Sequence, residues 1–448
     1  MKEEISLSLN GLDNSNIAYI TSILEKIGHI SVDFDASPIV GLLTHFSPEV
    51  RVLAIKNLAK IKNDIYIQKF IEIYENDTSS IVRREAVSAI GRQRNKKNIP
   101  FFIRVLSDND PKIACQAIRA LLIFKGERLI DETLKLLINH ENEMIKAVIS
   151  KEYYAQKTDK NTKPHSFVPE QLKDVIVLGD VKDVLKTIKE ESFHLTFTSP
   201  PYYNARDYST YESYEAYLSF LETVFKEVYR TTKEGRFLIV NTSPVIVPRI
   251  SRTHSSKRYP IPFDLHTILI KQGWEFIDDI VWEKPEYSVK NRIGGFQQHR
   301  KPLAYKPNSV TEYLMVYRKK TDKLLDWNIH QYDNDTIKSS KVSDGFFTTN
   351  VWKICPKSDK VHSAIFPIEL CQKVIEYYSY KGDLIFDPFA GSGTLGRTAK
   401  SMDRKFFLTE KEPKYFEYMK SFLDVESLLE ENHTKFMTLD EFKAKQGE

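Results

Sequence analysis

The chain has 448 residues, of which 41% are hydrophobic and 12% aromatic, so it is long enough for more than one packed domain. Its net charge of +4 permits a polyanionic partner without requiring one, and its three cysteines are too few and too scattered for a disulfide framework or a zinc site. No stretch approaches the roughly 20 apolar residues of a membrane span, and the charged start lacks a signal-type apolar run. We therefore expect a cytoplasmic protein with no metal and no membrane contact.

A helical pattern repeats through the first third of the chain. Apolar anchors at Val50, Val82 and Ile113 lie 32 and 31 residues apart, and each is followed by alanine four residues later and by leucine or isoleucine eight residues later. One helical face is thus repeated, with a small residue where helices approach. A second amphipathic helix is expected in each repeat, over 65–74, 99–106 and 130–138. The pattern resembles HEAT repeats over residues 36–155, preceded by an N-terminal extension of residues 1–35.

Helical solenoids bury one continuous core and present a long surface, so the repeats predict a protein partner or an extra contact with nucleic acid. Arginines could make that contact, although an ordinary solvated charged face is the favoured interpretation. The arginines in question are Arg51, Arg83, Arg84, Arg92 and Arg94. A polar, unpatterned stretch over 156–170 predicts a linker to the rest of the chain.

Residues 171–425 alternate between strand and helix patterns, and residues 426–448 are expected to form a C-terminal tail. Strands are expected over 174–178, 193–197, 236–241, 276–282, 312–317, 383–387 and 405–410. Helices are expected over 184–188, 214–229, 262–272, 368–378 and 395–402. The alternation predicts an α/β domain with a mostly parallel sheet and helices on both faces.

The stretch Thr198-Ser-Pro-Pro-Tyr-Tyr203 follows the apolar strand at 193–197. The two prolines end that strand, because neither can donate to a sheet ladder. A small hydroxyl, rigid carbonyls and an aromatic ring are therefore held just past the carboxyl end of a strand. Open α/β sheets bind their ligands at that place, although a rigid structural turn would give the same pattern.

A glycine turn, Asp387-Pro-Phe-Ala-Gly-Ser-Gly-Thr394, lies between a later strand and helix. Gly391 and Gly393 permit backbone geometry and a close ligand approach that a side chain would block, and the following helix offers free N–H groups. Glu410 ends the next strand, where a carboxylate can accept from ribose hydroxyls. The chain has no third glycine in dinucleotide spacing and no Gly-Lys-Ser/Thr, so the turn favours a nucleoside-type ligand over a pyrophosphate.

Together, the two stretches resemble the β group of amino DNA methyltransferases, the cytosine-N4 and adenine-N6 enzymes whose Ser/Asp-Pro-Pro-Tyr motif precedes the cofactor motif. The resemblance covers roughly residues 170–425. Further matching pieces are Asn204–Tyr208, Gly179-Asp180, Ile280–Lys284, Glu312-Tyr313, Tyr317–Lys319 and His362–Pro367. Leu408 is a departure, since the family often has glycine two residues before the acid at Glu410. The resemblance implies a Rossmann-like methyltransferase fold with circularly permuted motif order.

The resemblance implies catalytic roles for Ser199, Pro200, Pro201 and Tyr202. An exocyclic amine is a poor nucleophile, so acceptors must hold its two hydrogens and aim its lone pair. The Ser199 hydroxyl would take one hydrogen and the Pro200 carbonyl the other, while Tyr202 stacks on a base flipped out of the duplex. Tyr203 either assists or belongs to the core. A cytosine-C5 enzyme would need a Pro-Cys nucleophile, whereas Cys355-Pro356 has the opposite order.

The implied cofactor is S-adenosyl-L-methionine. Residues from both motifs and from neighbouring strand ends would bind it: Thr198, Asp180, Phe366, Pro367, Asp387, Pro388, Phe389, Gly391, Ser392, Gly393, Thr394 and Glu410.

Candidate contacts with double-stranded DNA lie in insertions at about 243–260, 286–306 and 320–350. Positive side chains can position phosphates, and arginine, glutamine and asparagine can read base edges, although solvated loops have the same composition. The candidate residues are Arg249, Arg252, Lys257, Arg258, Arg292, Arg300 and Lys301.

The sequence thus predicts a site-specific DNA methyltransferase acting on the N4 amine of cytosine, in a prokaryotic restriction-modification or host-defence system and associated with the nucleoid. Serine at position 199 favours cytosine, with adenine N6 as the alternative. A methyltransferase for RNA or protein is disfavoured by that serine and by the motif order. A non-catalytic scaffold is disfavoured by the intact motifs.

Overall fold

A computed structural model describes residues 16–28, 34–61, 64–154, 165–203, 211–247, 251, 253–254, 256–356, 366–427 and 434–446. Arg249, Arg252, Asn204–Tyr208 and His362–Ile365 lie outside these residues. The chain divides into two compact units, Met1–Thr158 and Asp159–Glu448, and each is described by itself. Among the described helices, none combines the length and the apolar character that crossing a membrane requires.

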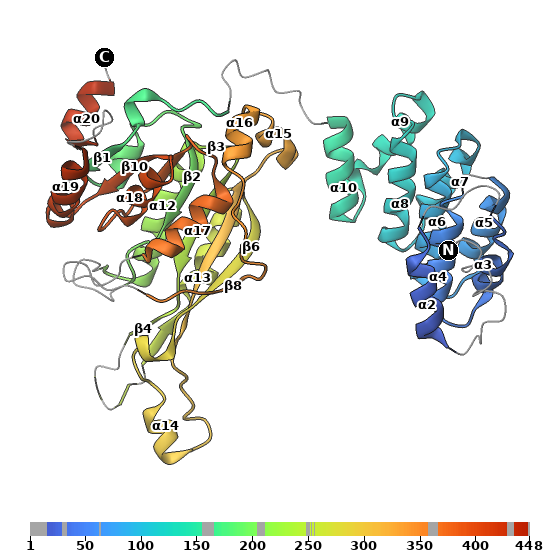
Figure 1. Cartoon of the computed structure of the whole chain (residues 1–448), viewed down its shortest axis with the longest axis horizontal. Helices are drawn as coiled ribbons and strands as arrows, with labels where there is room; N and C mark the ends of the chain where they lie inside the picture. Colours follow the sequence, from blue (N-terminus) through green and yellow to red (C-terminus); the bar gives the residue numbers. More distant parts are fainter. Residues whose placement is uncertain are drawn as a thin grey trace. The chain divides into compact units, whose positions relative to one another are not determined.

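The first unit is entirely helical within its described residues and has a repeated pattern (Figure 1). Val50, Val82 and Ile113 are fully buried in its single core, which confirms the predicted helical face. The α-helices of this unit are α2 (Ile17–Lys26), α3 (Ser37–Gly41), α4 (Pro48–Leu58), α5 (Ile67–Asn76), α6 (Ser80–Arg92), α7 (Ile99–Val105), α8 (Pro111–Leu122), α9 (Arg128–Lys135) and α10 (Glu143–Ile149).

Three of the five arginines considered for nucleic-acid contact are paired within the repeats. Arg51 Nε donates to Asp77 Oδ2 at 2.7 Å, Arg83 lies 3.8 Å from the Asp108 carboxylate, and Arg92 lies 2.6 Å from that of Glu85. Arg51 and Arg83 thereby tie one repeat to the loop that opens the next. These pairs agree with the favoured interpretation of an ordinary charged surface.

The second unit is built on a nine-stranded sheet, in the order β11-β1-β10-β9-β2-β3-β7-β6-β8. All pairs from β11 to β3 are parallel, β7 is antiparallel to both neighbours, and β8 is parallel to β6. The strands are β1 (Val175–Leu178), β2 (Phe193–Thr198), β3 (Thr232–Thr242), β6 (Trp274–Glu283), β7 (Thr311–Lys319), β8 (Val351–Lys353), β9 (Leu384–Asp387), β10 (Lys405–Glu410) and β11 (Lys435–Thr438).

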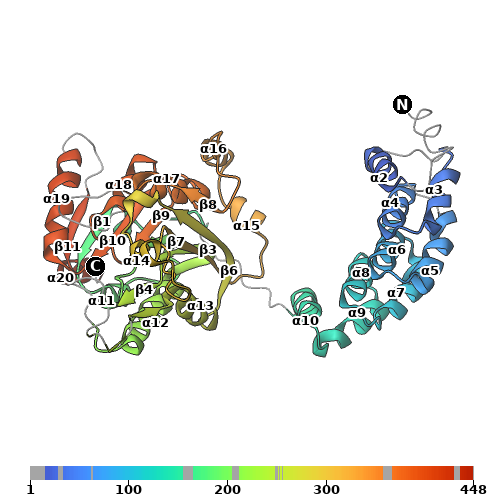
Figure 2. The same ribbon diagram turned by 90° about the horizontal axis from the view of Figure 1, so that it is seen from below.

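Helices cover both faces of this sheet, as predicted (Figure 2). On one face lie α11 (Val181–Leu185), α12 (Tyr214–Thr231), α13 (Ile261–Lys271) and α20 (Leu439–Gln446), and on the other α17 (Ile368–Tyr378), α18 (Thr394–Ser401) and α19 (Pro413–Ser427). Alternate residues of the central strands supply the two cores: Leu238 and Val240 pack on the first face and Ile239 on the second. Strands buried on both sides explain the continuous apolar runs of the sequence.

The strand order reverses direction between β2 and β9. From β2 the chain continues through α12 to the neighbouring β3, whereas from β9 it continues through α18 to β10 on the other side. In sheets of this kind the diverging connections leave a crevice at the carboxyl ends of the two strands. The loop that begins at Ser199 and the turn that follows Asp387 therefore emerge side by side, although they are far apart in sequence.

Two insertions leave the sheet at the same end and extend away from it (Figure 1). One is the antiparallel ribbon of β4 (Val245–Val247) and β5 (Lys257–Tyr259), and the other joins β6 to β7 and contains α14 (Gly294–His299). We call these two insertions the recognition finger. A third insertion contains α15 (Leu325–Ile329) and α16 (Asn334–Ser339).

Two stretches differ from the sequence-based expectation. Residues 435–438, expected in a tail, form β11, which pairs in parallel with β1. Only four residues with one buried side chain make this strand, so its periodicity was too short to predict. His165 and Val168, expected in the linker, are buried, and the His165 carbonyl oxygen accepts from Lys233 Nζ at 2.7 Å.

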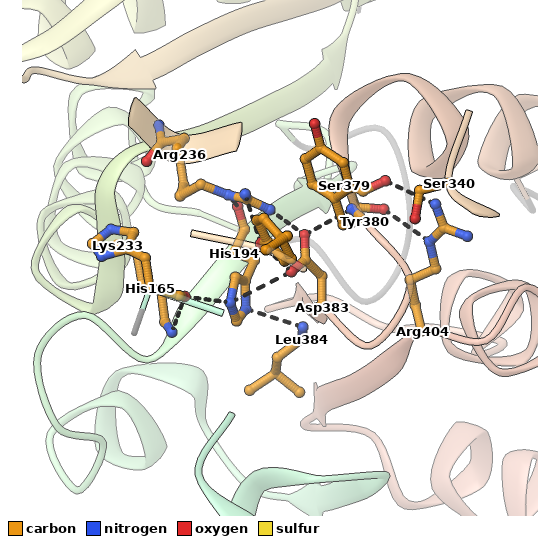
Figure 3. Close-up of polar contacts among 12 residues, drawn as sticks. His165, His194, Lys233, Arg236, Ser340, Ser379, Tyr380, Asp383, Leu384 and Arg404 are labelled. Atoms are coloured by element: carbon orange, nitrogen blue, oxygen red, sulfur yellow. Dashed lines mark hydrogen bonds and ion pairs between the residues drawn. The ribbon is translucent and has the colours of Figure 1, made fainter. Parts of the chain in front are cut away.

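A buried polar network lies at the opposite end of the sheet, where β2, β3 and β9 begin (Figure 3). His194 Nδ1 accepts from the backbone N–H of Leu384 at 3.1 Å, and its Nε2 lies 2.9 Å from the carbonyl oxygen of His165. Nδ1 must therefore be unprotonated and Nε2 must donate. Burial, together with the nearby positive charge of Lys233, lowers the pKa of His194 well below its usual value, so the ring is neutral.

Asp383 is the hub of the same network. Its carboxylate forms a buried ion pair with Arg236, and it accepts from the Tyr332 hydroxyl at 2.5 Å and from the backbone N–H of Tyr380 at 2.8 Å. Tyr332 comes from the third insertion, so this insertion is anchored to the base of the sheet.

Candidate active site

A cavity of about 780 Å³ opens at the carboxyl ends of the central strands. Strands β1, β10, β9, β2, β3 and β6 all end there, and β7 begins there. The residues predicted for the site that line the cavity are Asp180, Ser199, Pro200, Pro201, Tyr202, Phe366, Asp387, Pro388, Phe389, Gly391, Ser392, Thr394 and Glu410. The two motifs therefore meet in one cavity. Thr198, which was also predicted for the site, does not line the cavity and is fully buried.

The loop after β2 divides its side chains between the cavity and the core. Ser199 is partly exposed and lines the cavity, whereas Tyr203 is only 7% exposed. The Tyr203 ring packs against Tyr214, Tyr217 and Tyr259, at centroid distances of 4.9 to 5.6 Å. Of the two roles considered for Tyr203, this packing favours the core.

Tyr202 is held by its hydroxyl as well as by its ring. The hydroxyl donates to Glu312 Oε2 at 3.0 Å, and Glu312 lies at the start of β7. Burial and the Glu312 carboxylate raise the pKa of Tyr202 well above its usual value, against hydrogen bonds from Ser243 and Ser199 that lower it. The phenol is therefore protonated and available as a donor.

Three residues that sequence reasoning did not assign to the site complete this cluster: Glu312, Asn241 and Lys284. Asn241 Nδ2 donates to Glu312 Oε2 at 2.7 Å and lies 3.4 Å from Ser199 Oγ, and Lys284 forms an ion pair with the same carboxylate. All three line the cavity. The signal for them was positional. Asn241 ends an expected strand, Glu312 begins one and Lys284 follows one by two residues, all at the edge of the sheet where Ser199 lies.

The two motifs are joined by one buried hydrogen bond. Thr198 Oγ1 donates to Asp387 Oδ1 at 2.7 Å, and the backbone N–H of Phe389 donates to the same oxygen at 3.0 Å. Burial is the main cause that raises the pKa of Asp387 to about 7, against these two hydrogen bonds, which lower it. Asp387 thus fixes the glycine turn to the loop that carries Ser199.

The glycine turn requires its glycines. Gly391 and Gly393 have φ angles of 52° and 73°, in the left-handed region that favours glycine. A Cβ atom on Gly393 would also lie 2.7 Å from Met419 Sδ. Gly393 is the N-cap of α18, which begins at Thr394. Ser392 and Thr394, on either side of this glycine, line the cavity. The turn therefore brings bare backbone next to the cavity.

Glu410 ends β10 and holds the far side of the turn. Its Oε2 accepts from the backbone N–H of Gly391 at 2.7 Å, and its Oε1 accepts from that of Glu412 at 2.8 Å. Burial raises the pKa of Glu410, and the backbone hydrogen bonds oppose the rise. Each carboxylate oxygen keeps a further lone pair that can accept from a ligand hydroxyl.

The remaining predicted cofactor residues lie around the same end of the sheet. Asp180 caps the N-terminus of α11 by accepting from the backbone N–H of Lys182 at 2.9 Å. Phe366 stacks on Phe197 with ring centroids 4.5 Å apart, and Pro367 caps α17.

The predicted DNA-contacting residues that the structure describes lie on the recognition finger, not in the cavity. Lys257 and Arg258 stand on β5, and Arg292, Arg300 and Lys301 flank α14; all five are exposed.

Comparisons with known proteins match both units. The sequence model of a family described as DNA methylase, of N6/N4 type, matches residues 193–421, about half of the chain. The model of HEAT repeats matches residues 67–150, which confirms the character of the first unit.

Individual relatives match the second unit. The type II β methyltransferase M.BslI of Bacillus sp. (strain NEB-606) is 28% identical over 278 residues, covering 59% of this chain and 29% of that protein. The type II methyltransferase M.ScaI of Streptomyces caespitosus is 30% identical over 239 residues, covering 50% of this chain and 73% of that protein. The chain spans about a third of the length of the first two relatives it matches.

Among solved structures, the putative DNA modification methylase TTHA0409 of Thermus thermophilus, complexed with S-adenosyl-L-methionine, is 25% identical, with a TM-score of 0.48. The match covers 59% of this chain and 98% of that one.

Proposed function

Because this chain belongs to the DNA methylase family of N6/N4 type, we propose that it transfers the methyl group of S-adenosylmethionine to an exocyclic amine of a base in duplex DNA. The observation that carries the proposal is the hydrogen bond between Thr198 and Asp387, which holds the Ser-Pro-Pro-Tyr loop and the glycine turn in one cavity. The amine site and the donor site are thereby adjacent.

The residues at the glycine turn fit the proposed cofactor. Gly391 brings bare backbone to the cavity wall, which permits close approach, and Glu410 and Asp180 offer acceptors for ribose hydroxyls and for the cationic amino acid end. Pro388 and Phe389 give apolar surface to an adenine ring, and Phe366 would pack on the methionine end of the cofactor. The bound cofactor would supply a methyl group on a positively charged sulfur.

Ser199 and Pro200 are proposed to prepare the amine. The Ser199 hydroxyl is partly exposed at the cavity, and Pro201 fixes the peptide that carries the Pro200 carbonyl. These two acceptors would hold the two amine hydrogens and turn the nitrogen lone pair toward the methyl group, with little reorganisation at reaction. Tyr202 lines the same cavity, where its ring can stack on the base.

The proposed base is cytosine, methylated at N4, because serine precedes the two prolines. Adenine N6 is the second candidate, since the same acceptors suit either amine. The amine of a base inside a duplex cannot reach this cavity, so the base must be flipped out. The exposed cations of the recognition finger would hold the phosphates, which makes double-stranded DNA the proposed substrate.

We assign the biological setting by the same reasoning. The relatives named above are type II methyltransferases, which supports a role in restriction-modification or host defence. The repeats of the first unit are proposed to hold a protein partner or a further stretch of DNA.

The test is methyl transfer from labelled S-adenosylmethionine to DNA, RNA and protein in parallel, followed by mass spectrometry of the modified nucleosides. N4-methylcytosine in duplex DNA is expected. Label on adenine N6 would leave the function and change the base, whereas label only on RNA or protein would overturn the proposal. Methylation-sensitive sequencing of DNA from a host that expresses the chain then gives the recognition sequence.

A further inference from the structure

Glu312 is surrounded by polar contacts that the proposed amine-holding groups, Ser199 and Pro200, do not require. Stacking on a base requires only the ring of Tyr202, yet its hydroxyl donates to a carboxylate 110 residues further along the chain. That carboxylate carries a counter-ion, Lys284, and receives a second donor, Asn241. Glu312 therefore has three polar partners beside the proposed amine site, and holding the amine explains none of these contacts.

Methylation of the amine leaves a proton to be removed. A new N–C bond forms as the S–C bond of the donor breaks, and the nitrogen becomes positive until one of its N–H bonds breaks. The Ser199 hydroxyl can take this proton only if its own proton moves on, because an alcohol is a weak base. The contacts of Ser199 therefore decide where the proton goes.

The hydrogen bonds around Ser199 lead to Glu312. Asn241 Nδ2, 3.4 Å from Ser199 Oγ, is a donor and cannot take a proton. The Tyr202 hydroxyl, by contrast, donates its own proton to Glu312 Oε2 at 3.0 Å, so its oxygen can accept from the Ser199 hydroxyl, which lines the same cavity. Ser199, Tyr202 and Glu312 thus line one path that ends at the carboxylate.

We propose, on the basis of the function proposed above, that Glu312 is the terminal proton acceptor of methyl transfer and that Tyr202 relays the proton to it from Ser199. The amine proton passes to Ser199 Oγ, the Ser199 proton passes to the Tyr202 oxygen, and the Tyr202 proton passes to Glu312 Oε2. The positive charge of the donor and the negative charge of Glu312 are both neutralised, so atoms and charges balance.

Lys284 and Asn241 act as positioning residues in this scheme. Lys284, the residue after β6, forms an ion pair with Glu312 and holds the carboxylate in place. Lys284 and Tyr202 are the titratable groups in contact with Glu312 among the described residues. Asn241 Nδ2 holds Glu312 and Ser199 at a fixed separation.

Two substitutions test the relay without changing its shape. Glu312→Gln keeps an oxygen that can accept from Tyr202 but removes the basic carboxylate, and Tyr202→Phe keeps the stacking ring but removes the hydroxyl. Each is expected to lower the single-turnover rate of methyl transfer by about 10²-fold or more at pH 7.5, the usual range for a lost acid–base group. The double variant is expected to be no slower than the slower single variant, because both act on one path.

Matched controls are Glu275→Gln, which breaks an exposed cross-strand pair with Arg318, and Tyr229→Phe on α12. Both should keep the wild-type rate. Cofactor affinity, measured by calorimetry, and DNA affinity should be unchanged in all variants.

A second readout needs neither cofactor nor DNA. In the ligand-free protein the ultraviolet titration of Tyr202, assigned by its loss in Tyr202→Phe, should move to lower pH in Glu312→Gln, because the neighbouring negative charge is gone. A Tyr202→Phe variant at the wild-type rate overturns the relay while the proposed function stands. A wild-type protein that transfers no methyl group to DNA overturns the proposed function instead, while the titration still reports whether Tyr202 and Glu312 are linked.

Discussion

Thr198 and Asp387 are 189 residues apart in sequence and share a buried hydrogen bond of 2.7 Å at the point where the strand order of the sheet reverses. Thr198 is the last residue of β2 and Asp387 the last residue of β9, and one motif follows each strand. The hydrogen bond therefore fixes the distance between the proposed amine site and the proposed cofactor site. Both the chemistry and the stability of the crevice should depend on it.

Replacing Thr198 by valine keeps the volume and removes the donor. The Asp387 carboxyl group would keep its hydrogen bond from the Phe389 N–H, and we expect a loss of about 1–3 kcal/mol in the free energy of unfolding. Cofactor affinity should fall as well, because the turn loses its anchor. Urea unfolding and calorimetry measure both effects, with Thr223→Val on the exposed side of α12 as the control. Unchanged values in both assays would remove the coupling role.

Ser199→Ala removes a hydroxyl that faces the cavity and leaves the buried bond of Thr198 in place. We expect methyl transfer to DNA to fall by at least about 10²-fold, while the affinity for S-adenosylmethionine stays within about twofold of wild type. Single-turnover kinetics and calorimetry separate the two quantities. Activity near the wild-type level would contradict the role given to Ser199.

Gly393→Ala should destabilise the second unit. The residue has a φ of 73°, and its new Cβ would lie 2.7 Å from Met419 Sδ, so strain and a clash add to a cost of about 1–3 kcal/mol. Thermal unfolding should show the loss. Gly295→Ala is the control, since no atom lies within 4 Å of its added Cβ and its φ is not positive.

Asp387 should make stability depend on pH in a direction opposite to that of most carboxylates. Its pKa is about 7 in the folded protein and about 3.9 in an unfolded chain, so between these values the folded state holds more protons. Its contribution to the free energy of unfolding therefore falls as pH rises through this window, by up to about 1.4 kcal/mol per pH unit.

Asp387→Asn removes that titration. The stability of the variant relative to wild type should rise between about pH 4 and pH 7 and then level off. Neutral buried histidines such as His194 cost stability on acidification in both proteins, so they cancel in the comparison. Denaturant unfolding across the pH range checks this prediction, and a difference that does not change with pH would contradict the raised pKa of Asp387.

The recognition finger should bind DNA through its charges. Arg300→Ala and Lys301→Ala should each weaken binding about equally for all sequences and reduce the slope of log affinity against log salt by about one. Lys381→Ala, which breaks an exposed pair with Asp403 near the start of β9, should leave the slope unchanged. Fluorescence anisotropy at several salt concentrations measures the slope; a wild-type slope in both finger variants would place the DNA elsewhere.

Much of the fold was predictable because its signals are local. Two prolines after an apolar run end β2, glycines with positive φ mark the turn before α18, and a period of 31 to 32 residues marks the repeats. The contacts of Glu312 were not predictable, because no local pattern tells which of several strand-end polar residues will meet. Tyr202 carried no sign that its hydroxyl, rather than its ring alone, would be engaged.

The polar network at the base of the sheet was missed for the same reason. His194 lies within an apolar strand and Asp383 precedes another, and only the pairing of β2 with β9 brings them together. His165 fell in a stretch with polar composition, although its carbonyl oxygen is held by Lys233 and it contacts His194. The composition of a segment does not reveal which of its residues are buried, because burial depends on contacts with segments far away in the sequence.

The pairing of β11 with β1 also protects the protein from self-association. Strand β1, Val-Ile-Val-Leu, would otherwise be the outermost strand on that side, with its amide and carbonyl groups open to another chain. The strand that covers it is short and begins with an exposed lysine, a combination that discourages further strand addition. Removal of residues 434–446 should therefore produce a protein that aggregates before it loses its cofactor site.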